Sequence, residues 1–246
     1  MIKHMLASGL IAGCLVACLV TVLQFAFQED HVLLAERYES GELVHFQPPA
    51  ADHDHASTET ATQSPDAAAP DDHDHMHGDA EESFALRQSK SVLAALVTYC
   101  GYGLVIVSGF AMANQFGIAI PPSHGLLWGL AGFACFQLAP AMGLEPELPG
   151  GHAAPLQARQ IWWIGTALAT AAGLALLAYG NGVLPRLAAI VLLAIPHVIG
   201  APHLDQFTGV VPPELAASFA ARSLGVGLVA WLTLGGLACW LWTRPT

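Results

Sequence analysis

The stretch MLASGLIAGCLVACLVTVLQFAF, residues 5–27, contains no charged side chain. A helix needs about 20 apolar residues to cross a bilayer, and this stretch satisfies that length without interruption. It continues to Phe27 with no small-residue cleavage site at its end, which favours a retained anchor over a removed signal peptide. We therefore predict a first transmembrane helix within residues 1–27.

Five further apolar segments follow it along the chain: 92–113, 125–142, 161–179, 187–199 and 223–242. They are too evenly apolar for the strands of a membrane barrel, which alternate between apolar and polar residues. We predict an all-α integral membrane helical bundle of five to six transmembrane helices. Segment 187–199 is short, and it either spans, re-enters, or lies partly unwound. Gly9 with Gly13, and Gly125 with Gly129, have the spacing that lets membrane helices approach closely.

The charges are concentrated in one part of the 246-residue chain. Charged residues make up 11% of the sequence and apolar residues 54%, an imbalance typical of membrane proteins. Residues 28–90 hold fifteen of the nineteen acidic and three of the eight basic residues, a local charge of −12. We therefore divide the chain into a first helix (1–27), an acidic insert (28–90) and a transmembrane bundle (91–246). No basic stripe is present, which excludes nucleic-acid binding.

The insert contains two runs that alternate histidine with aspartate, DHDH at 52–55 and DDHDHMH at 71–77. Imidazole nitrogens beside carboxylate oxygens suit divalent transition metals such as Co²⁺, Ni²⁺, Zn²⁺ and Cu²⁺. The alternative is a solvated acidic linker. Residues 48–82 are low in complexity, and we expect them to be disordered without a ligand. The candidate metal ligands in the insert are Asp52, His53, Asp54, His55, His73, Asp74, His75 and His77.

A second candidate metal site lies in IPHVIGAPHLD, residues 195–205, where Pro-His occurs twice. Proline removes a backbone donor and can break a helix, and transporters use broken helices to coordinate ions. His197, His203 and Asp205 could then offer two nitrogens and one oxygen to a cation. The alternative is that the helix ends at Pro196 and that both histidines lie in the membrane interface.

Several signatures of other functions are missing from the sequence. There is no GxxxxGK[ST] phosphate loop, no HExxH, no Gly-x-Ser-x-Gly and no CxxC pair. The five cysteines lie in apolar stretches and do not form a disulfide framework. We expect neither an enzyme nor a resident cofactor.

Several blocks of the chain resemble the CbtA family, predicted cobalt transporter subunits of bacteria. The blocks are LLAERYE (33–39), WGLAGF (128–133), LAPAMGL (138–144), EPELPG (145–150), RQIWW (159–163), IPH (195–197) and GAP (200–202). The resemblance implies a bacterial inner-membrane protein for Co²⁺ uptake, linked to cobalamin biosynthesis, with a small His-rich membrane partner, CbtB. Glu36, Glu147 and Arg159 match motif positions, and we expect interfacial structural roles, with Arg159 pairing one of the acids.

Two functional hypotheses follow. The first is a membrane subunit for uptake of Co²⁺ or Ni²⁺, with the His-rich loop capturing metal and His197 and His203 coordinating it near a gate. The second is a non-transporting metal-binding receptor or scaffold. With six spans and an inside N-terminus, three basic residues outside the insert lie inside and two lie outside, so charge leaves the orientation open. An acidic metal-binding insert favours an outward-facing position.

Overall fold

The computed structural model describes residues 2–45, 84–206 and 209–244 of the chain. These residues form helices joined by loops, and the β contact recorded among them is an isolated bridge between Gly151 and Gly209. The prediction of an all-α membrane bundle is confirmed. The predicted disorder of residues 48–82 lies outside the described residues.

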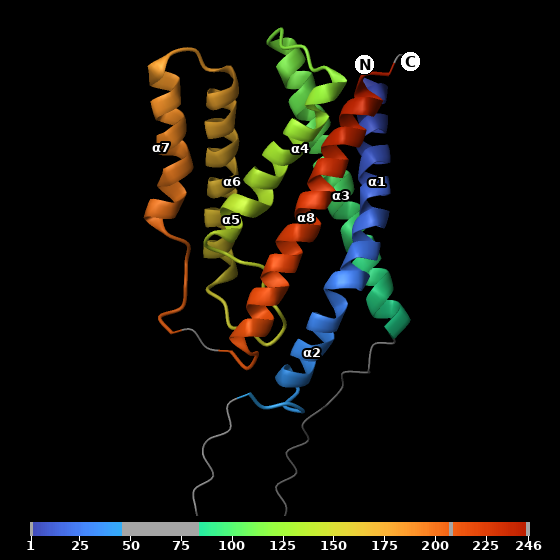
Figure 1. Ribbon diagram of the computed structural model, residues 1–246, viewed down its shortest axis with the longest axis vertical. Helices are drawn as coiled ribbons and strands as arrows, with labels where there is room; N and C mark the ends of the chain where they lie inside the picture. Colours follow the sequence, from blue (N-terminus) through green and yellow to red (C-terminus); the bar gives the residue numbers. More distant parts are fainter. Residues whose placement is uncertain (1, 46–83, 207–208, 245–246) are drawn as a thin grey trace, which may run out of the picture.

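The chain runs up and down between two ends (Figure 1). The helices that make these passes are α1 (Ile2–Phe27), α3 (Phe84–Gln115), α4 (Gly125–Phe133) with its continuation, α6 (Leu156–Tyr179), α7 (Val183–Ile199) and α8 (Pro213–Trp242). Both termini lie at one end, which we call the terminal face. The opposite end, which we call the loop face, is formed by α2 (Glu29–Glu39), the α5–α6 loop and the described part of the α7–α8 loop.

Glycines set the closest helix contacts in the bundle. A Cβ atom added to Gly13 of α1 would lie 2.5 Å from the Cα atom of Cys100 on α3, and one added to Gly103 would collide with the Gly9 carbonyl. Gly125 and Gly129 of α4 meet α8 at Gly235 in the same way. The predicted close packing at both glycine pairs is therefore confirmed, because only a residue without a side chain fits there.

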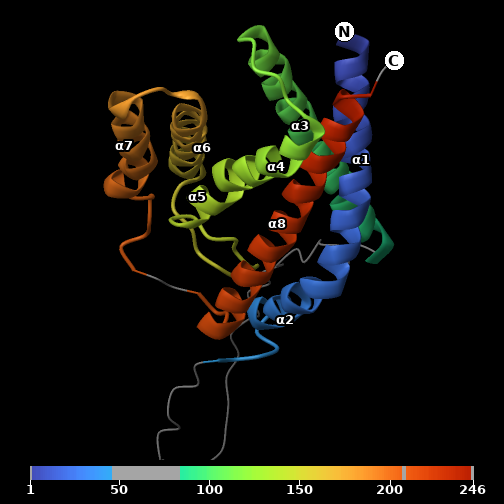
Figure 2. The same cartoon turned by 45° about the horizontal axis from the view of Figure 1, so that its top comes forward.

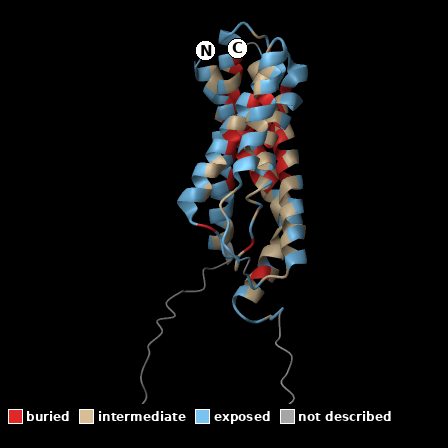
Figure 3. Ribbon diagram, turned by 90° about the vertical axis from the view of Figure 1, so that its left-hand side faces the viewer, coloured by how far each residue is buried: buried red, intermediate tan, exposed pale blue. Residues whose placement is uncertain are grey.

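The core lies where α1, α3, α4 and α8 meet. Its largest fully buried side chains include Phe110 of α3 and Trp231 and Leu234 of α8. The outer surfaces remain apolar, with Leu15 and Val22 of α1 about half or more exposed, and Figure 3 shows exposed residues along the outer sides of the helices. Such surfaces suit a bilayer, where lipid chains cover apolar side chains.

Within the described residues, four helices, α1, α3, α6 and α8, are long and apolar enough to cross a membrane by length and composition. The predicted fifth segment is the 17-residue helix α7, which is continuous through Pro196 and ends before Gly200, a residue with a positive φ of 85°. Among the described elements, α7 packs on α6 alone, and this pair stands beside the rest of the bundle (Figures 1 and 2). The helix therefore neither breaks nor ends at Pro196.

The third apolar segment is irregular. It begins as α4, widens into the π-helical segment η2 (Ala134–Leu138), and finishes as the short helix α5 (Ala139–Ala141). Pro140 has no N–H to bond the Phe136 carbonyl four residues back, so a regular α-helix would leave that carbonyl unpaired. The π-helical geometry instead lets the N–H of Ala139 reach the Ala134 carbonyl five residues back.

Candidate functional site

The predicted metal ligands fall into two groups in the structure. Those of the insert lie outside the described residues, so their metal binding stays a prediction. His197, His203 and Asp205 are described. No group of three or more His, Cys, Asp or Glu side chains within the described ranges is arranged to hold a metal ion. A joint site formed by these three residues also stays a prediction.

His197 belongs to the contact between α6 and α7. Its ring lies edge-on to the Trp162 ring, with centroids 6.2 Å apart and an interplanar angle of 72°. The Trp162 indole Nε1 donates to the Pro196 carbonyl at 3.2 Å, and the Gly200 N–H donates to the same oxygen at 3.0 Å. The Pro-His dipeptide therefore ties the last turn of α7 to α6.

His203 lies beyond the helix and lines a cavity of about 520 Å³ that we call the loop pocket. Glu145 to Leu148 of the EPELPG block and Arg159 also line it, and His152 adds a second imidazole. Asp205 is exposed and is not part of the lining. The pocket thus joins two parts of the chain, residues 143–159 and 202–217, and its lining includes two carboxylates and two imidazoles.

An ion pair fixes one wall of this pocket. Arg159 Nη2 lies 2.8 Å from Glu147 Oε2, which confirms the expectation that Arg159 pairs with an acid. Glu145 is exposed in the same loop, and its carboxylate lines the pocket. Gly150 closes the loop with a φ of 81°, where a Cβ atom would lie 2.9 Å from Val210 and 3.3 Å from Glu39. Helix α2 and both loops therefore meet at this glycine.

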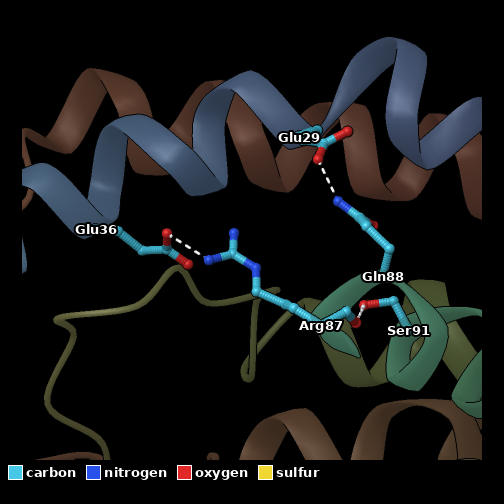
Figure 4. Close-up of polar contacts among 5 residues, drawn as sticks. All are labelled: Glu29, Glu36, Arg87, Gln88 and Ser91. Carbon is cyan, nitrogen blue, oxygen red and sulfur yellow. Dashed lines mark hydrogen bonds and ion pairs between the residues drawn. The ribbon is translucent and has the colours of Figure 1, made fainter. Parts of the chain in front are cut away.

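Helix α2 is bound to the base of α3 by two side-chain contacts (Figure 4). Arg87 Nη1 donates to Glu36 Oε2 at 2.9 Å, and Gln88 Nε2 donates to Glu29 Oε1 at 2.5 Å. The matched motif residue Glu36 therefore has an interfacial structural role, as expected. Sequence reasoning missed its partner, although Arg87 is one of only three basic residues in the insert region.

The other side of α2 rests on α8. The His31 Nε2 and Ser218 Oγ atoms lie 3.0 Å apart, and Arg222 Nη1 donates to the Phe27 carbonyl at 3.0 Å. Burial lowers the pKa of His31, the nearby Arg222 guanidinium lowers it further, and Asp30 opposes both effects. The lowered pKa favours the neutral form of this imidazole.

A second cavity, of about 460 Å³, lies between α1, α2 and α3, and we call it the polar cavity. It begins near Glu29 and Gln88 at the loop face and is also lined by Gln137 of η2. Sequence reasoning missed it. The available signal was the carboxamides of Gln24 and Gln137 within otherwise apolar segments. The hydroxyl and carboxamide side chains of its lining are Thr21, Gln24, Gln28, Gln88, Ser91, Thr98, Tyr99, Tyr102 and Gln137.

The fold and these cavities define a multi-pass helical membrane protein with a polar face assembled from α2 and two loops. The chain belongs to the CbtA family, described as a probable cobalt transporter subunit, whose model matches residues 2–243. This match covers nearly the whole chain and agrees with the resemblance drawn from the sequence blocks. No curated protein and no solved structure matches the chain.

Proposed function

We propose that this chain is the membrane subunit of a bacterial uptake system for Co²⁺ or the chemically similar Ni²⁺. The observation that carries the proposal is the loop pocket, which gathers Glu145, Glu147, His152 and His203 on one face of the bundle. The family description supports cobalt as the transported ion and implies partner subunits.

The ligand chemistry of the loop pocket suits such an ion. Imidazole nitrogens and carboxylate oxygens together favour borderline divalent cations over Mg²⁺ or Ca²⁺, which prefer oxygen ligands alone. Because Arg159 already neutralises Glu147, Glu145 is the carboxylate most available to a cation in the pocket. In the described residues the two imidazoles and Glu145 are not arranged as one metal site, so we propose that they attract the cation to the pocket without enclosing it as a single set of ligands.

The insert adds a capture step in this proposal. Its described flanks, the residues after α2 and the start of α3, both lie at the loop face (Figure 1). Its alternating histidines and aspartates are thus tethered through these flanks to the same face as the loop pocket, and tethering raises the local concentration of whatever they bind. With this face outward, a divalent cation moving inward gains about 2.3 kcal/mol per charge per 100 mV of membrane potential, without ATP.

The partner we propose is a small His-rich membrane protein of the CbtB type, working beside this chain in the bacterial inner membrane. Cobalamin biosynthesis is the process that we expect to consume the metal. The support for both is the family description of a subunit rather than a complete transporter.

The test is Co²⁺ accumulation in cells that lack other cobalt importers and express this chain with and without its partner. We expect wild type to raise uptake, and His152→Ala/His203→Ala to lower it at least about tenfold by removing both nitrogen ligands. His124→Ala is the matched control, because that exposed histidine lies in the 3₁₀ turn before α4, at the terminal face.

Deleting residues 48–82 should reduce uptake only at limiting Co²⁺, since that insert serves capture and not passage. Metal binding by wild type without accumulation above the empty-vector level would reject transport and leave the receptor role. Equal losses for the His124 and His152/His203 variants would reject the loop pocket as the receiving site.

A further inference from the structure

The polar cavity between α1, α2 and α3 is a groove that opens to the side of the bundle. The two spans touch at Gly13, and toward the loop face α3 leans away from α1 while α2 bridges the gap (Figure 1). Ser91, Ala94 and Thr98 of α3 line the cavity and are exposed. Because α1 and α3 are both long and apolar enough to span a membrane, this open side faces the surrounding lipid.

The α3 wall of the groove is built from small side chains at helical spacing. Ser91 and Ala95 are four residues apart, as are Ala94 and Thr98, and all four line the cavity. In a membrane, small residues at this spacing let the backbone of another helix approach closely. The contact at Gly13 shows α1 using such an approach on one side of α3. The polar cavity is the open space beside this second strip of small residues.

Polar side chains of the groove lack partners at membrane depth. Thr98 lies six residues, about 9 Å, inside the uncharged segment 92–113. In the described part of the chain, neither Thr98 nor its neighbour Tyr99 has a side-chain hydrogen bond. Tyr99 is only 7% exposed and lines the cavity, and its hydroxyl oxygen is not one of the fully covered polar atoms. The hydroxyl therefore stays accessible from the cavity, where lipid chains offer it neither donor nor acceptor.

From these observations we propose that the polar cavity binds one transmembrane helix of a partner subunit. The inference rests on the proposed function, in which this chain is one subunit of an uptake system, and it assigns the surface that meets the partner. The family description of a transporter subunit supports such a partner. A helix that carries Ser, Thr, Asn, Gln or His toward α3 supplies the hydrogen bonds that Thr98 and Tyr99 lack, and lipid does not.

The two ends of the groove set the chemistry and extent of this contact. At the loop face Arg87 is paired with Glu36, whereas Glu29 accepts a hydrogen bond from the neutral Gln88 and keeps its charge. The partner helix therefore carries a basic side chain at its loop-face end. The groove stops at Tyr102, which packs on the aromatic core. From Arg87 to Tyr102 the lining runs about 22 Å at 1.5 Å per residue, so the contact covers about four turns of a helix.

The first experiment maps what occupies the groove in living cells. The photoreactive residue p-benzoylphenylalanine replaces Ser91 or Thr98, which line the cavity. The controls are Leu93 and Val97, which are 59% and 66% exposed on the outer surface of α3 and do not line it. The cells also express the small His-rich membrane partner of the proposed function with an affinity tag, and they are irradiated before solubilisation.

We expect a product that joins this chain to the tagged partner, at least about tenfold stronger from the two cavity positions than from the two controls. Products that contain two copies of this chain would overturn the proposal and make a second copy the occupant. Products with lipid alone would also overturn it, as would equal yields from cavity and control positions.

The second experiment fills the groove with a bulky side chain. Ala94→Trp places an indole in the cavity at an exposed position, and Val97→Trp places the same ring on the outer surface. We expect Ala94→Trp to lower the partner recovered with this chain at least about tenfold, and Val97→Trp to leave it unchanged. An unchanged melting temperature of each variant alone shows that the fold is intact. Full recovery of the partner with Ala94→Trp would overturn the proposal.

The third variant isolates the hydrogen bonds. Tyr99→Phe keeps the ring and removes the hydroxyl, so we expect the partner to bind roughly threefold more weakly, as for loss of one hydrogen bond between membrane helices. The measurement is energy transfer between labelled subunits in lipid vesicles. Tyr179→Phe at the end of α6 is the control, because that tyrosine is 47% exposed and lies outside the cavity. Unchanged binding by Tyr99→Phe would reject hydrogen bonding as the basis of docking.

Co²⁺ accumulation in the same cells separates this proposal from the proposed function. Uptake by wild type with its partner, but without a crosslink from Ser91 or Thr98, would reject the groove as the interface and leave the uptake function intact. A crosslink to the partner without uptake above the empty-vector level would reject uptake and leave the interface.

Discussion

At the scale of single residues, small or polar side chains in an apolar sequence decide how closely the helices pack. Gly227 is an example, because it leaves room for the Gln137 carboxamide between η2 and α8. Two residues earlier, Gly225 has open space around it. The two glycines look alike in the sequence, and their difference arises from what packs against each.

Substituting Gly227 tests this contact. Gly227→Ala should lower the melting temperature of the detergent-solubilised protein by several degrees, since overpacking a core costs about 1–3 kcal/mol. Gly225→Ala should be neutral or stabilising, because alanine favours a helix over glycine by up to about 1 kcal/mol.

The double variant Gly227→Ala/Gln137→Ala tests this explanation. It should recover most of the lost thermal stability, because the colliding carboxamide is gone. A melting temperature as low as that of Gly227→Ala alone would contradict it.

At the scale of elements, α2 positions the loop face. It follows α1 after a short break at Gln28 and is held by α3 on one side and α8 on the other. Its last turn also touches the α5–α6 loop, where Gly150 meets Glu39. An element of 11 residues therefore links both cavities to three helices.

The Glu36–Arg87 pair should couple α2 to α3 measurably. Each side chain is about one-third exposed, so a double-mutant cycle with Glu36→Gln and Arg87→Gln should give a coupling of about 0.5–1 kcal/mol in thermal unfolding. The Arg37–Glu42 pair is the control, because its side chains are 50% and 58% exposed and should couple near zero. Equal coupling in the two pairs would contradict the structural role given to Glu36.

At the scale of the whole molecule, the arrangement separates two faces. Lys3 begins α1, Arg186 is in the first turn of α7 and Arg244 follows α8, and these helix ends lie at the terminal face. Arg159 is in the first turn of α6, whose start lies at the loop face, and Arg222 bonds the carbonyl of Phe27 at the end of α1. This small difference sets orientation only weakly, because the positive-inside rule counts basic residues in short loops. The function proposed above requires the loop face to be outward.

Reporter fusions test that orientation. Alkaline phosphatase inserted near residue 65 should be active, because this enzyme folds only on the outer side of the inner membrane. A fluorescent protein fused after Thr246 should fluoresce, because that end of the chain would lie in the cytoplasm. The reverse pattern would place the insert in the cytoplasm and reject outward metal capture.

The sequence by itself determined that the chain is a helical membrane protein, where its apolar segments lie, and which family it belongs to. These properties follow from local composition, since an uncharged stretch such as 5–27 has the same preference for lipid wherever it packs. The spacing of Gly9 and Gly13 also predicted a close helix contact, because residues four positions apart lie on the same face of a helix.

Only the tertiary structure decided which residues meet. It placed His203 with Glu145 and His152, seated His197 against Trp162, and joined Glu36 to Arg87 across the insert. It also paired Gln137 with Gly227, 90 positions away in the chain, through a π-helical turn that Pro140 favours. Such contacts depend on how helices cross and diverge, and the periodicity of a single segment carries no information about its neighbours.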